Sequence, residues 1–254
     1  SKTKIFDALF RNFGLRKTGS VNVSFLTLIK TLIKIKIGQK NVDKVRQILG
    51  KKAHILSKIP TIPKNAPKKL HELHRAWTIA KDSNASSPGV PVAYYSLNVN
   101  GILFPGERSW ESRWAILRNI TDFKGKRILE LGCNMGLLSC SLLREKQVES
   151  TIAVDVDADI LNAARHVASA YEVTPILLQI NLDGDDVWEE DLRAYSPDIV
   201  FALNVLHWIK NKKRLLNFLG EFRELIFEGH ESFDIERRRL EEVGFNDFRT
   251  VTLT

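Results

Sequence analysis

The second half of the chain alternates short apolar runs with stretches of helical periodicity, and this rhythm restricts the possible folds more than any other feature. The apolar runs span 127–131, 151–156, 176–180, 199–203 and 225–227. The helical stretches lie between and after them, near 137–146, 158–171, 186–194, 211–220 and 234–243. This alternation predicts an α/β fold with a doubly wound, mostly parallel sheet. A last run at 248–253 is expected to form a sixth strand.

The first of these runs leads into a turn rich in glycine. It reads Ile128-Leu-Glu-Leu-Gly-Cys-Asn-Met-Gly136, and glycine lets the backbone pass close to a ligand at the start of a helix. The second run contains Asp155, placed where a carboxylate can accept hydrogen bonds from both hydroxyls of an adenosine ribose. The turn matches neither the dinucleotide pattern G-x-G-x-x-G nor the phosphate-binding pattern G-x-x-x-x-G-K-[ST].

The same residues resemble the class I S-adenosylmethionine-dependent methyltransferases. That family has an acidic residue followed by x-G-x-G-x-G, and this chain has Glu130-x-Gly132-x-Asn134-x-Gly136. Asn134 replaces the middle glycine, and asparagine tolerates a positive φ better than most residues. The resemblance extends from about Trp110 to Thr254. It implies a Rossmann-like methyltransferase sheet, S-adenosyl-L-methionine as cofactor and a transferase activity.

The resemblance also implies a set of cofactor contacts. Glu130 and the turn would face the methionine part, the second strand end would hold the ribose, and the third would reach the adenine edge. Asn204 would line the pocket of the methyl donor. For Asp183, a simple loop turn with Gly184 is the alternative. The residues concerned are Glu130, Gly132, Cys133, Asn134, Gly136, Asp155, Val156, Asp157, Asn181, Leu182, Asp183 and Asn204.

A further cofactor contact is implied by segment 106–114, which we expect to be a loop that leads into a helix over 110–120. It resembles the corresponding segment of the tRNA wobble-uridine carboxymethyltransferases, in which a basic residue beside an aromatic one meets the carboxyl end of a related cofactor. Arg113 occupies that position here. The alternative places Arg113 on the helix surface, with Trp110 and Trp114 in the core.

Candidate general bases follow the fourth and fifth apolar runs. They are His207 on the one hand, and Glu228 and His230, with Glu231 beside them, on the other. Ligands bind at the carboxyl ends of strands in open α/β sheets, and a histidine can accept a hydroxyl proton near neutral pH. The alternative for His207 is packing beside Trp208. An anionic acceptor such as a phosphate would need no base.

Two local sequences bear on the acceptor. After the fourth run stands Asn204-Val-Leu-His rather than an Asn-Pro-Pro-Tyr motif, which disfavours N-methylation of DNA bases. Segment 242–249 and the end of the fifth run resemble the methyltransferase domain of O-antigen chain-terminating enzymes, which methylate a glycan end or its phosphate. The usual fold has a seventh, antiparallel strand that this sequence does not reach, so we expect a missing last strand and allow for a further domain beyond residue 254.

The charge is divided unevenly along the chain. Residues 1–75 hold 18 of the 38 Lys and Arg residues and only three of the 30 acids. We therefore expect a basic helical extension and linker over 1–75, a helical and loop segment capping the cofactor site over 76–125, and the cofactor-binding core over 126–254. Around the first of these boundaries we expect a helix over 70–80 and a loop over 82–91. The basic arm suggests an anionic membrane surface, RNA or the acidic body itself as its partner.

The two cysteines, Cys133 and Cys140, are too few for a structural zinc site, and we expect neither a metal nor a disulfide. No apolar run reaches the roughly 18 residues of a membrane span, and no signal peptide is evident. We predict a cytoplasmic protein and leave open that it binds peripherally to a membrane.

Three functions remain open from the sequence. The first is O-methylation of a glycan, a lipid-linked or another small acceptor. The second is methylation of RNA, such as tRNA, with the basic arm contacting phosphates. The third is a methyltransferase-like scaffold without catalysis.

Overall fold

The computed structural model describes residues 61–83 and 92–251, which all belong to one compact unit, His54–Thr254. The helices expected within 1–60, most of the basic arm and most of the loop expected over 82–91 lie outside the described residues. No helix in the described ranges is long and apolar enough to cross a membrane.

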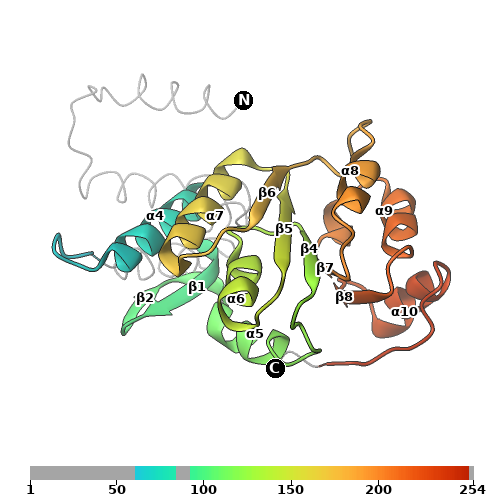
Figure 1. The fold of residues 1–254 in the computed structure, drawn as a ribbon, viewed down its shortest axis with the longest axis horizontal. Helices are drawn as coiled ribbons and strands as arrows, with labels where there is room; N and C mark the ends of the chain where they lie inside the picture. Colours follow the sequence, from blue (N-terminus) through green and yellow to red (C-terminus); the bar gives the residue numbers. More distant parts are fainter. Residues whose placement is uncertain (1–60, 84–91, 252–254) are drawn as a thin grey trace, which may run out of the picture. The chain divides into compact units, whose positions relative to one another are not determined.

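The central feature is a five-stranded parallel sheet in the order β6-β5-β4-β7-β8 (Figure 1). The strands are β4 (Arg127–Leu131), β5 (Ser150–Asp155), β6 (Ile176–Gln179), β7 (Ile199–Leu203) and β8 (Glu224–Glu228). The helices between and after them are α6 (Leu137–Glu145), α7 (Ala158–Tyr171), α8 (Trp188–Ala194), α9 (Lys212–Leu219) and α10 (Phe233–Glu241). The predicted doubly wound α/β architecture is confirmed, with bounds close to those expected.

Helices cover both faces of this sheet, which is why its strands are predominantly apolar. Successive side chains of β4 point to opposite faces: Ile128 joins a core with α4 (Lys68–Asp82), α5 (Trp110–Leu117), α6 and α7, whereas Leu129 joins one with α8 and α9. Helix α4 lies alongside α7 (Figure 1). His166 contacts Glu72 between the two helices at 2.6 Å. The helix expected over 70–80 is therefore confirmed as α4.

A second sheet precedes the central one and was not expected from the sequence. Its order is β2-β1-β3, with β1 (Ala93–Val99) antiparallel to β2 (Ile102–Phe104) and parallel to β3 (Gly106–Ser109). Segment 106–109 is thus a strand and not part of a loop, which corrects the prediction. Gly106 is required there because a Cβ atom would lie 1.9 Å from the backbone nitrogen of Ser96.

The end of the described chain also differs from expectation. Residues 246–251 form no strand, so the sixth strand predicted at 248–253 is wrong for residues 248–251. Residues 252–254 lie outside the described range. Within the described residues β8 is the edge strand. A shallow hollow follows this edge, with α5 on one side and Phe245 and Val251 on the other.

Candidate active site

The direction in which strands are added to the parallel sheet reverses between β4 and β7. The chain passes from β4 outward to β5 and β6, then returns to β7 on the other side of β4. In open α/β sheets such a switch point opens a crevice at the carboxyl ends of the strands, and ligands bind in it. The glycine-containing turn after β4 and Asn204 after β7 lie at this point, as the sequence predicts.

The turn after β4 takes an unusual backbone conformation. Gly132, Asn134 and Gly136 all have positive φ, at 68°, 51° and 68°. Asn134 supports its own conformation by accepting a hydrogen bond from the N–H of Met135 at 2.8 Å through its side-chain oxygen. A Cβ atom at Gly136 would approach that of Ala164 to 2.9 Å. Asparagine therefore replaces the middle glycine without loss of the turn.

Asp155 links the turn to the end of β5. One carboxylate oxygen accepts from the N–H of Asn134 at 2.9 Å, and the other accepts from the N–H of Asp157 at 3.1 Å. Burial raises the pKa of Asp155, and these backbone hydrogen bonds oppose the rise. Each carboxylate oxygen keeps a lone pair that can accept from a ribose hydroxyl. Next to it, Val156 is 59% exposed and Asp157 caps the N-terminus of α7.

Glu130 lies beneath the turn and is almost fully buried. One of its oxygens accepts from the N–H and the hydroxyl of Ser139, at 3.1 and 2.6 Å. Burial raises the pKa of Glu130 to about 7, while the hydrogen bonds from Ser139 act to lower it. Such a carboxyl group is poised to ionise when a cation arrives.

Cys133 contributes to the turn through its backbone and through its thiol, which donates to the carbonyl of Asn134 at 3.4 Å. Its N–H donates to the carbonyl of Val154 at 2.8 Å, and its side chain is buried beside Ala153 and Leu161. Burial raises the pKa of the thiol well above its usual value. Cys140 is also free and buried, so neither thiol is set up as a nucleophile.

Asp183 has a different environment from the one the resemblance implied. Its carboxylate accepts hydrogen bonds from the backbone N–H groups of Lys210 and Asn211, at 2.9 and 3.0 Å. Its own N–H donates to the side chain of Asn181 at 3.0 Å, and Leu182 is buried in the core. Asp183 therefore ties the turn after β6 to the segment after β7. The N–H of Gly184 also donates to the carbonyl of Asn181 at 2.9 Å, and a contact of Asp183 with the adenine edge stays a prediction.

Arg113 is buried, with only 5% of its surface exposed, which excludes the alternative that it lies on a helix surface. Its guanidinium group pairs with the carboxylate of Glu228, at the end of β8. The same carboxylate accepts from Asn204 at 2.6 Å and pairs with Arg108 at 3.0 Å. The Nε atom of Arg113 is buried without a hydrogen-bond partner, which leaves it available to a ligand anion.

Sequence reasoning missed two members of this cluster. Arg108 comes from β3 and lies over the ring of Tyr94, which comes from β1 and meets the amide of Asn204 at 3.3 Å. Segment 106–114 contains Arg108, but the position of this arginine beside Glu228 depends on residues 106–109 forming a strand. The second sheet thus reaches the carboxyl edge of the central one.

The predicted bases occupy two positions at this edge. The rings of His207 and His230 lie 4.5 Å apart, and both side chains are exposed. Glu228 is instead held by two arginines and an amide. Burial acts to raise the pKa of Glu228, but Arg113, Asn204 and Arg108 hold it below its usual value, so this carboxylate is a weak base.

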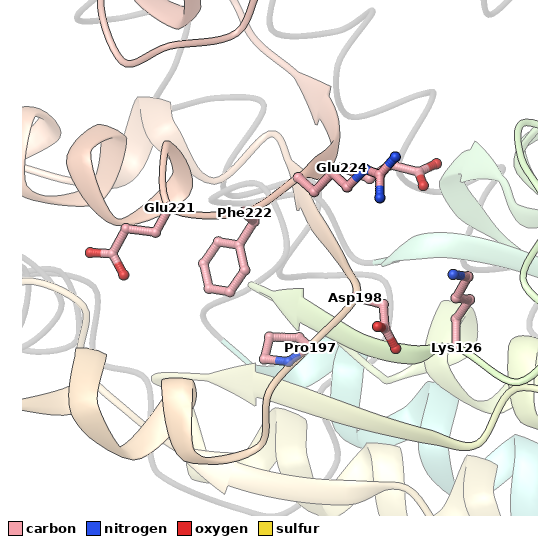
Figure 2. Close-up of a pocket in the computed structure, with 7 residues that line it drawn as sticks. Lys126, Pro197, Asp198, Glu221, Phe222 and Glu224 are labelled. Carbon is pink, nitrogen blue, oxygen red and sulfur yellow. The ribbon is translucent and has the colours of Figure 1, made fainter.

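A separate hollow lies at the opposite edge of the sheet, at the amino ends of β4, β7 and β8 (Figure 2). It is lined by Lys126, Pro197, Asp198, Glu221, Phe222, Arg223 and Glu224. Arg127 pairs with Asp198 at its margin, and Glu221 pairs with Arg193. The glycine turn lies at the other ends of the strands, so this hollow is not part of the candidate active site.

Comparison with known proteins agrees with the geometry of the crevice. Residues 129–226 match a family model described as a methyltransferase domain. The chain contains a methyltransferase domain. The matched range begins in β4 and ends in β8, so it includes the glycine turn, Asp155 and Asn204. With its parallel sheet and its acidic residue before the glycine turn, this domain is of the class I type, which uses S-adenosylmethionine.

One curated relative is the U6 snRNA methylphosphate capping enzyme Amus of Drosophila melanogaster. It is 30% identical to this chain over 99 residues, which are 34% of this chain and 32% of the relative. The chain therefore spans about a third of the length of the curated relative that it matches.

Solved structures similar to the chain include two bacterial methyltransferases. The S-adenosylmethionine-dependent methyltransferase of Mesorhizobium loti aligns with a TM-score of 0.35 and 23% identity, over 42% of this chain and 46% of that one. The one of Aquifex aeolicus aligns with a TM-score of 0.41 and 15% identity, over 53% of this chain and 80% of that one.

Proposed function

We propose that this chain transfers the methyl group of S-adenosylmethionine to an oxygen atom of an acceptor bound over the carboxyl ends of β7 and β8. The observation that carries the proposal is the position of two exposed histidines that lie side by side. His207 comes after β7 and Asn204, and His230 comes after β8, which ends at Glu228. Asn204 and Glu228, with Arg108 and Arg113 paired to Glu228, lie at the same carboxyl edge as the glycine turn, so donor and acceptor would meet at one edge of the sheet.

The residues of the crevice fit the cofactor. Asp155 would hold the ribose hydroxyls, the turn would leave room for the methionine chain, and Glu130 would face its ammonium group. The buried Nε atom of Arg113 has no partner in the described structure, which suits the carboxylate on the same carbon as that ammonium group. When bound, S-adenosylmethionine supplies an electrophilic methyl group on a sulfonium.

The protein's own part in the reaction is orientation and, for a hydroxyl acceptor, acceptance of a proton. A ring nitrogen of His207 or His230 would take that proton as the acceptor oxygen forms its new bond to carbon. An ionised phosphate acceptor has no proton to lose, and the two imidazoles would then serve as hydrogen-bond donors. We place the acceptor in the class of glycans, lipid-linked glycans and related small molecules.

The experiment that tests this function is methyl transfer by the full chain from tritiated S-adenosylmethionine to separated carbohydrate, lipid and RNA fractions of a cell extract. We expect label in the carbohydrate or lipid fraction, and loss of most of it in a His207→Ala, His230→Ala double variant. Label confined to RNA, or incorporation into none of the three fractions, would overturn the proposal.

RNA is the second candidate acceptor, and one observation favours it. The Amus enzyme, to which the chain is 30% identical over 99 residues, is a methylphosphate capping enzyme of U6 snRNA by name. A basic arm over 1–75 would supply contacts to phosphates, and binding that rests on such contacts weakens steeply with salt. In the transfer assay this candidate predicts label in RNA that declines as the salt concentration rises.

Glu130 leads to a prediction about protons. At pH 6 this carboxyl group is mostly protonated because its pKa is about 7. The positive charges of the cofactor favour the ionised form, so binding should release up to about one proton at pH 6 and fewer as the pH rises above 7. Affinity should fall roughly tenfold per pH unit below that pKa.

Titration calorimetry in buffers of different ionisation enthalpy measures this release. The Glu130→Gln variant keeps an oxygen that can accept from Ser139 but has no carboxyl proton to lose. It should bind the cofactor with little proton release both at pH 6 and above pH 7. Equal release by the variant and the wild type would show that another group is responsible.

A further inference from the structure

Trp208 is the most exposed large apolar residue among those the structure describes. It is 73% exposed and ends a short 3-10 helix, η1 (Leu206–Trp208), that directly follows β7 and Asn204. Its ring meets that of His207 edge-on, with centroids 5.3 Å apart, and His207 in turn lies 4.5 Å from His230. His207 thus contacts both other rings at the proposed acceptor site, and the indole of Trp208 is open to solvent.

The exposure of Trp208 does not come from a loose backbone. Its N–H donates to the carbonyl of Val205 at 3.0 Å, and Leu206 before it is buried. Two residues further on, the N–H groups of Lys210 and Asn211 donate to Asp183. The fold therefore holds an apolar ring in water at the mouth of the site, where burial elsewhere would have been more favourable.

We propose that the ring of Trp208 is a stacking platform for a sugar ring of the acceptor. This proposal rests on the proposed function and deepens it: the acceptor would carry a saccharide unit next to the oxygen that is methylated. A rigid indole offers a broad apolar face at little cost in conformational entropy. The apolar C–H face of a pyranose fits such a surface, and the hydroxyl groups at its edge need hydrogen-bonding partners.

The surroundings of Trp208 favour a sugar over a nucleic-acid strand. The turn that is fastened to Lys210 and Asn211 carries the carboxylates of Asp183, Asp185 and Asp186. These match in number the three lysines that follow the indole, Lys210, Lys212 and Lys213, and the charge of the next residue, Arg214, is paired with Glu189. A groove for single-stranded nucleic acid combines aromatic rings with an excess of positive charge, whereas carboxylates beside lysines can pair with sugar hydroxyls.

The test measures saturation transfer by NMR from the full chain, in the presence of S-adenosylhomocysteine, to glucose, galactose and mannose phosphates and to a short oligouridylate. We expect transfer to the ring protons of at least one hexose phosphate. Trp208→Ala should weaken that binding about tenfold, the effect of losing one good aromatic contact, and Trp208→Phe should retain most of it. Leu103→Ala, which removes another exposed apolar side chain far along the second sheet, should change nothing.

The outcomes separate this proposal from the proposed function. Calorimetry with S-adenosylmethionine on the same proteins should give equal affinity for the wild type and Trp208→Ala. Failure of the wild type to bind the cofactor would count against the proposed function. With cofactor binding intact, the platform is overturned if no hexose phosphate receives saturation, if Trp208→Ala binds as well as the wild type, or if only the oligouridylate depends on Trp208.

Discussion

Replacing Asp155 with alanine should abolish measurable binding of S-adenosylmethionine. The carboxylate is placed to accept from the ribose hydroxyls, and a hydrogen bond to a charged group contributes about 1.5–3 kcal/mol, so losing two should weaken binding at least about 100-fold. The variant also removes the acceptor for the N–H groups of Asn134 and Asp157. Because these bonds hold the positive-φ turn, the loss of affinity should exceed that of a simple deleted contact.

Titration calorimetry on the full chain checks this expectation. Asp155→Asn keeps one oxygen acceptor and should bind more weakly than the wild type but better than the alanine variant. Asp159→Ala is the matched control, because Asp159 lies in the first turn of α7, four residues after Asp155, and is exposed to solvent. Affinity within a factor of two or so of the wild type for Asp155→Ala would show that the cofactor binds elsewhere.

Replacing Glu228 with alanine should lower the free energy of unfolding by about 3 kcal/mol, since removing one partner of a buried ion pair leaves an uncompensated charge. Arg113, which is 5% exposed, would lose its counter-ion, and the amide of Asn204 would lose its acceptor. The same carboxylate joins Arg108 of the second sheet to the end of β8. The variant should therefore loosen the second sheet as well as the site.

Urea denaturation of the full chain measures the change, and Glu224→Ala on the same strand is the control, with an expected effect within about 0.5 kcal/mol. The pKa of Glu228 lies below its usual value, so its contribution is complete above the unfolded pKa of about 4.3 and is lost as pH falls through the folded pKa. The gap between wild type and Glu228→Ala should narrow at acid pH. A gap that is small at pH 7, or that grows on acidification, would contradict this account.

The parallel sheet could be predicted from the sequence because its strands are buried on both faces and their apolar runs contrast with the helices between them. The second sheet was missed: β1 has seven residues and buries alternate ones, but its partners β2 and β3 have only three and four residues and are mostly exposed or half-buried. β3 contains Gly106, Glu107, Arg108 and Ser109, which carries no apolar signal. Its strand character depends on pairing with β1, a contact that local sequence does not express.

The candidate site divides in the same way. Glu130, the glycine turn and Asp155 could be placed from local sequence, because a glycine-containing turn after an apolar run and an acidic residue at the next strand end follow from the α/β alternation itself. Asp183 could not be assigned, because its partners, the N–H groups of Lys210 and Asn211, are 27 and 28 residues away. Nor could the pairing of Arg113 with Glu228, separated by 115 residues.

The sequence by itself determined that this protein would form a parallel α/β sheet with a glycine turn over a buried acid, since apolar periodicity and backbone conformation are local properties. Which charges compensate one another, and which rings come into contact at the carboxyl edge, depends on the folded arrangement. The ion pair of Arg113 with Glu228 and the ring contacts of His207 with Trp208 and His230 bring together residues from different parts of the chain. Their energies depend on distance and burial, and both quantities exist only once the chain has folded.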